Sequence, residues 1–90
     1  MVLSVDKPKL VDMVILNNDV TSVEAVRMVL GAIFGFNYEE INSIIYQADT
    51  VGESYVGTYT RAVSNFLLAE VSNMCSTLKF RLEEHVYEGL

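Results

Sequence analysis

Few residues of this 90-residue chain are of the kinds that carry out catalysis. The chain has one histidine, His85, with no plausible partner for nucleophilic chemistry. One cysteine, Cys75, excludes an intrachain disulfide and a cysteine-based zinc site, and we expect its thiol to be buried. The pairs Glu39-Glu40 and Glu83-Glu84 are adjacent, so their carboxyls point apart instead of converging on a substrate. The five glycines form no phosphate-binding loop, and we expect neither an enzyme nor a bound metal or cofactor.

A cluster of short polar side chains is the one unusual feature. Asn17, Asn18 and Asp19 follow an apolar run, and Thr21 comes two residues later. Such residues routinely satisfy a turn and the start of a helix. Alternatively, the cluster holds a cation beside an apolar helix face that holds a greasy group. Asp49 is either a polar residue in a later link or additional negative charge for the same site.

The elements that would position these residues follow from periodicity and caps. The apolar run 10–16 predicts a buried strand. Thr21 and Glu24 have capping-box spacing, which predicts a helix that ends near Gly35. Asn37 and Glu40 repeat the pattern for a second helix. The remaining elements are a strand over 54–59, a third helix capped by Thr60 with an apolar stripe, and a one-sided strand over 78–83 before a tail that frays from Glu84; the stripe is formed by Val63, Leu67, Val71, Met74 and Cys75.

The predicted order is β-α-α-β-α-β, which favours an α+β fold with a three-stranded antiparallel sheet covered by three helices. We expect a flexible arm over 1–10, one domain over 11–86 and a C-terminal tail over 87–90. The formal net charge of −6 argues against a nucleic-acid partner, because phosphate binding needs clustered Lys and Arg. The apolar fraction of 51% excludes disorder. With no membrane span and no signal-peptide pattern, we expect a cytoplasmic protein.

Three segments also resemble a known family. The apolar strand runs into Val14–Val26, Gly52 leads into Tyr55–Thr60 and a helix, and Leu78–Glu83 closes the domain. In this order they resemble the ClpS family of small adaptors. Those adaptors bind proteins with destabilising N-terminal residues and pass them to a Clp-type AAA+ unfoldase-protease. The resemblance implies a partner with a free N-terminal Leu, Phe, Tyr or Trp.

The resemblance also assigns roles to single residues. Asn17 matches the amide that receives the α-amino group, and the resemblance implies that Asn18, Asp19 and Asp49 bind this group with it. Thr21 and Val26 match further positions of the site. The implied pocket for the first side chain contains Leu16, Thr21, Val23, Val26 and Ile45. Several positions depart from the family: Asn18 replaces an aspartate, Val23 and Ile45 replace methionines, and Asp49 replaces the histidine that contacts the α-amino group.

The side that would contact the unfoldase departs further. A glutamate and a lysine of the third helix in the family align with Ala62 and Leu67. The chain is therefore either an adaptor with altered docking or a decoy or inhibitor, of the kind that a phage could encode, that binds without delivering substrates.

Overall fold

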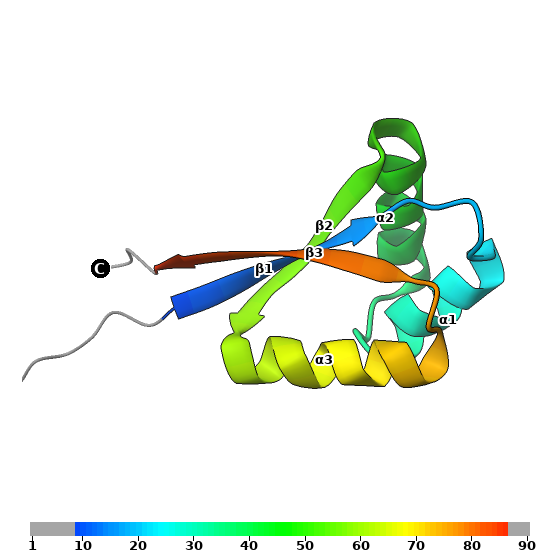
Figure 1. Ribbon diagram of the computed structural model, residues 1–90. Coiled ribbons are helices and arrows are strands. Elements are labelled where there is room, and N and C mark those ends of the chain that lie inside the picture. The colour runs from blue at the N-terminus through cyan, green and yellow to red at the C-terminus, as the bar shows by residue number, and fades with distance from the viewer. Residues whose placement is uncertain (1–8, 87–90) are drawn as a thin grey trace, which may run out of the picture.

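The computed structural model describes residues 9–86, which form three strands and three helices in the predicted order (Figure 1). The arm predicted over 1–8 and the tail predicted over 87–90 lie outside the described residues. The elements are β1 (Lys9–Leu16), α1 (Val23–Ala32), α2 (Tyr38–Val51), β2 (Glu53–Thr60), α3 (Arg61–Met74) and β3 (Lys79–Val86). The predicted α+β class and element order are confirmed.

The sheet is antiparallel with strand order β2-β1-β3, so β1 is its centre. This position explains the apolar composition of β1, in which Val11, Met13, Val14 and Ile15 are all buried. β1 begins at Lys9, whose partner in the ladder is Val86. The prediction that 9–10 belong to a flexible arm is therefore wrong.

The last strand is longer than predicted. β3 continues to Val86, because its final residues pair with the first half of β1. Glu84 forms an ion pair with Arg61, and this contact lowers the pKa of the Glu84 carboxyl. His85 lies with its Nε2 3.0 Å from an Asp12 carboxylate oxygen. The prediction that the chain frays from Glu84 is wrong for the residues up to Val86.

The N-terminal caps of α2 and α3 agree with the sequence prediction, and that of α1 differs by one residue. Asn37 caps α2 and forms the predicted capping box with Glu40. Thr60 caps α3 as predicted, accepting from the Val63 amide. The cap of α1 is Ser22 and not Thr21, because the helix begins at Val23 and the Ser22 hydroxyl accepts from the Ala25 amide at 3.1 Å.

A glycine with a left-handed backbone follows each of the first two helices. α1 ends at Ala32, and Gly35 follows with a φ of 74°, so the chain turns back toward α2 through a left-handed residue. Gly52, at φ 97°, ends α2, and β2 begins at the next residue. Any residue with a side chain would be strained at either of these positive φ angles, so glycine is favoured at both positions.

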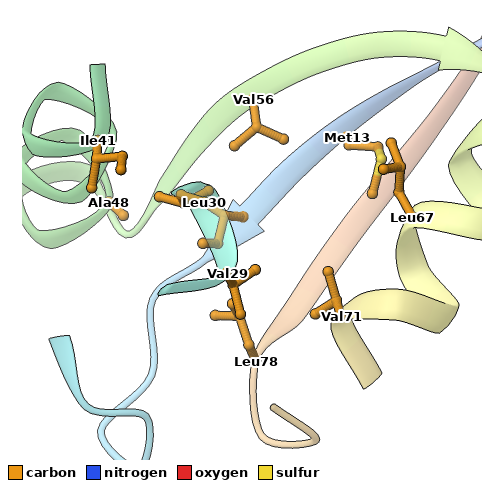
Figure 2. Close-up of a cluster of buried hydrophobic side chains, with 10 residues drawn as sticks. Met13, Val29, Leu30, Ile41, Ala48, Val56, Leu67, Val71 and Leu78 are labelled. Carbon is orange, nitrogen blue, oxygen red and sulfur yellow. The ribbon is translucent and has the colours of Figure 1, made fainter. Parts of the chain in front are cut away.

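The core lies where the helices meet β1 and β2 (Figure 2). Its members with the lowest exposure include Met13, Val29 and Leu30, each at 0%. Leu67 and Val71 bring α3 onto this cluster, with Leu67 beside Met13 in Figure 2. The third-helix stripe is only partly buried, since Val63, Met74 and the neighbouring Phe66 are exposed.

Candidate functional site: a pocket between β1, α1 and α2

A pocket of about 380 Å³ opens where the end of β1 meets α1 and α2. The chain between β1 and α1 contributes Asn17, Asn18 and Thr21, and Leu78 closes the pocket from the start of β3. Its lining is Ile15, Leu16, Asn17, Asn18, Thr21, Val23, Val26, Arg27, Asn42, Ile45, Tyr46, Ala48, Asp49 and Leu78. A pocket of this size matches the lower range of small-molecule and peptide side-chain sites.

The apolar wall comes from two helices. Val23 and Val26 lie one turn apart on α1, and Ile45 faces them from α2. Leu16 lies at the end of β1 and is half-buried. The structure therefore brings together in one pocket all five residues expected to hold an apolar side chain, Thr21 included.

A polar end lies beside this wall. The backbone amide of Asn17 donates to the Gly52 carbonyl at 2.9 Å, which ties the end of β1 to the end of α2. This bond brings Asn17 close to Asp49, one turn before Gly52. Within residues 9–86 neither side chain takes part in a hydrogen bond or ion pair, so both are available to a ligand.

Asn18 lines the pocket, but its amide is already engaged. Its Oδ1 accepts from the backbone amides of Val20 at 3.0 Å and Thr21 at 2.8 Å. Its Nδ2 donates to the Thr77 carbonyl at 3.3 Å. These bonds shape the loop from Asn18 to Thr21, so Asn18 is a residue that positions the site. Asp19 is exposed and is not among the lining residues.

The Thr21 hydroxyl has a partner far along the chain. It lies 2.7 Å from the Thr77 hydroxyl, and this contact joins the loop after β1 to the turn before β3. The Thr77 hydroxyl also lies 3.4 Å from Cys75 Sγ, and this hydrogen bond lowers the pKa of the thiol. Cys75 is half-buried, so the prediction of a buried thiol holds only in part.

Three polar lining residues were not anticipated from the sequence. Asn42 and Tyr46 lie seven and three residues before Asp49, on the same face of α2. Stepping back from Asp49 at helical spacing would have found both. Arg27 follows Val23 by one turn on α1 in the same way.

Among residues 9–86, Arg27 is the one cationic residue that lines the pocket. Its Cζ lies 5.5 Å from the centre of the Tyr38 ring, at the first residue of α2. Its Nη1 is shielded from solvent and has no hydrogen-bond partner in the structure. A shielded guanidinium nitrogen without an acceptor is unfavourable, because it loses hydration without replacement.

The two positions that align with the family's docking residues lie apart from the pocket on α3. Ala62 is exposed in the first turn. Leu67 is 9% exposed and belongs to the core, so its side chain does not offer a contact surface where the resemblance expects a lysine. Ala62 lies between Arg61, which pairs with Glu84, and the exposed apolar Val63.

The site has the properties of a binding pocket. Within the described residues no group of three or more His, Cys, Asp or Glu side chains is arranged to hold a metal ion. None of the three described helices is long and apolar enough to cross a bilayer. An apolar cavity with an unpaired amide and carboxylate at one end is suited to a ligand that joins a cationic group to an apolar side chain.

Comparisons with known proteins agree with this geometry. The chain matches the family described as "ATP-dependent Clp protease adaptor protein ClpS" over residues 6–83. A solved structure, ClpS2 of Agrobacterium tumefaciens bound to L-phenylalaninamide, is similar to it with a TM-score of 0.79 and 25% sequence identity. The similarity covers 88% of this chain and 100% of that one. The chain belongs to the ClpS family of Clp protease adaptor proteins, and its fold is that of the family.

Proposed function

We propose that this chain is a non-catalytic adaptor that binds proteins through a free N-terminus with a bulky apolar first residue, namely Leu, Phe, Tyr or Trp. The observation that carries the proposal is the joining of two features in one pocket. Asn17 and Asp49 offer free acceptors at one end, and Val23, Val26 and Ile45 form the apolar wall beside them.

Each half of this pocket answers one need of such a ligand. An α-ammonium that leaves water must keep hydrogen bonds, or its desolvation opposes binding strongly. The Asn17 amide oxygen and the Asp49 carboxylate supply acceptors, and Asp49 adds opposite charge. Full burial of a Leu or Phe side chain contributes about 1.5–3 kcal/mol. Neither half suffices alone, so the ligand must carry both groups.

The ligand of the similar Agrobacterium protein fits this division. L-phenylalaninamide has a free α-amino group and an aromatic side chain but no α-carboxylate. It therefore stands in for the first residue of a polypeptide. In this chain Asp49 occupies the place where the family resemblance expects a histidine, and we propose that it takes over the contact with the α-amino group.

Calorimetric titration with short peptides that differ only in the first residue tests the proposal. Peptides beginning with Phe or Leu are expected to bind with a stoichiometry of one, and those beginning with Ala or Gly to bind far more weakly. Equal affinity for Phe and Gly peptides would show that the apolar pocket does not receive the first side chain.

Presentation to a Clp-type AAA+ unfoldase in the cytoplasm is the second half of the proposed function. The alternative, a decoy or inhibitor that binds N-termini without delivering them, is favoured by one observation. Ala62 is uncharged and Leu67 is buried at the two positions where the family resemblance expects a glutamate and a lysine. An adaptor would retain a purified unfoldase in a pull-down and accelerate degradation of a Phe-starting substrate, whereas a decoy would slow its degradation.

A further inference from the structure

The arginines of the described chain differ in how their charge is used. Arg61 forms an ion pair with Glu84, and Arg81 pairs with both Glu53 and Glu83. Arg27 pairs with no carboxylate within residues 9–86, although the chain carries 12 acidic residues against 6 basic ones. The unpaired arginine is the one that lines the binding pocket.

The guanidinium of Arg27 is held in place without being neutralised. Its Cζ lies 5.5 Å from the centroid of the Tyr38 ring. A guanidinium over an aromatic ring keeps its N–H donors along its edge, where they match the two oxygens of a carboxylate. Arg27 is half-buried and lines the pocket, so an incoming carboxylate would displace no acceptor supplied by residues 9–86.

The position of Arg27 defines which part of a ligand can reach it. The pocket lining runs along one face of α2 from Asp49 through Tyr46 to Asn42, and Arg27 of α1 lies over Tyr38, one turn before Asn42. Seven residues separate Asn42 from Asp49, which is about 10 Å along a helix. An extended peptide advances about 3.3 Å per residue, so the chain after an anchored first residue covers this distance in about three residues, which places its third or fourth residue near Arg27.

We propose that Arg27 makes this adaptor select N-termini in which the apolar first residue is followed by an acidic residue at the third or fourth position. The inference rests on the proposed function, since it assumes that the α-amino group lies at Asn17 and Asp49. The Asp or Glu carboxylate would accept hydrogen bonds from the Arg27 edge. The preference would run against the net charge of −6, which by itself favours basic peptides.

The test compares peptides that begin with Phe and carry Glu, Gln or Lys at the third or fourth position, titrated at low ionic strength. The unmodified protein is expected to bind a Glu peptide about three- to tenfold more tightly than the matching Gln peptide. The lower value corresponds to an exposed ion pair and the upper value to a charge-assisted hydrogen bond. The preference should shrink as salt is added, because screening weakens a partly exposed pair.

Arg27→Gln is the informative variant and Arg61→Gln its matched control. Both remove one positive charge, but Arg61 pairs with Glu84 away from the pocket. Arg27→Gln should abolish or reverse the preference for Glu, whereas Arg61→Gln should keep it. Thermal unfolding of both variants confirms that each remains folded, and Arg27→Lys, which keeps the charge, should retain part of the preference.

Equal binding of the Glu and Gln peptides by the unmodified protein would overturn the inference. So would an equal loss of preference in Arg27→Gln and Arg61→Gln, because general charge would then be the cause. Failure of the proposed function has a different signature: N-acetylated peptides of either kind would bind as well as the free ones. If free Phe peptides bind and acetylated ones do not, the result for Glu against Gln judges Arg27 alone.

Discussion

Asp49→Asn tests whether the carboxylate at the end of α2 holds the α-amino group. The substitution keeps the shape of the side chain and removes its charge. An ammonium and a carboxylate 4 Å apart attract by about 1 kcal/mol in water and about 4 kcal/mol at an effective dielectric constant of 20. Because Asp49 is exposed, the lower part of this range applies. We expect a loss of about 1–2 kcal/mol, or roughly five- to thirtyfold in Kd.

Asp19→Asn is the matched control for this measurement. It removes the same charge from an exposed residue close to the pocket that does not line it. Calorimetry with a free Phe peptide should show a clear loss for Asp49→Asn and little change for Asp19→Asn. Equal weakening in both variants would assign the effect to net charge, and unchanged binding in Asp49→Asn would leave Asp49 a surface residue with no part in recognition.

Three further predictions concern the scaffold. Asn18→Ala removes acceptors from two backbone amides, so we expect urea unfolding to show a loss of about 1–2 kcal/mol and peptide titration to show weaker binding; unaltered stability would contradict the role of Asn18 in shaping the loop. Leu67→Ala should lower the free energy of unfolding by about 3 kcal/mol, whereas a Leu67 that serves only docking would leave it unchanged. The Thr58 hydroxyl and then His85 hold the pKa of Asp12 below its usual range, so their stabilisation is present above about pH 4 and is lost as the pH falls through the lowered pKa. Acid titration of Asp12→Asn should show a shallower loss of stability than the unmodified chain, and identical pH profiles would contradict this assignment.

Local signals in the sequence were sufficient for most of the fold. The capping box of Asn37 and Glu40 lies within four residues, so its hydrogen bonds depend on no contact with a distant part of the chain. The start of α1 was harder, because Thr21 and Ser22 are both good caps. The hydroxyl of Thr21 contacts Thr77, 56 residues away, and no local pattern contains that contact.

The end of β3 also depends on contacts with distant parts of the chain. The last residues of β3 read as a polar tail, yet Arg61 and Asp12 provide partners for Glu84 and His85. Those partners come from α3 and β1 and become neighbours only when the sheet forms. The alternation of residues along the strand was therefore correct, and its end was not predictable from composition.

The candidate site was predictable in its type and only partly in its members. The positions taken from the family resemblance lie together in the pocket, apart from Asp19. Asn42 and Tyr46 precede Asp49 by seven and three residues, so helical periodicity predicts that they share its face of α2. Arg27 follows Val23 by four residues, so helical periodicity also predicts its place beside the pocket. Its lack of a carboxylate partner within residues 9–86 is not predictable in this way, because it depends on where every acidic side chain lies.

Nuclear magnetic resonance titration of the isotope-labelled protein tests the central claim most directly. A peptide with a free N-terminal Phe and its N-acetylated form are added separately, and the backbone amide shifts are followed. We predict saturable shifts for the free peptide, centred on residues 16–26 and 42–52 and small along α3, and almost none for the acetylated form. Equal shifts for the two peptides, or shifts centred on α3, would contradict recognition of a free N-terminus in this pocket.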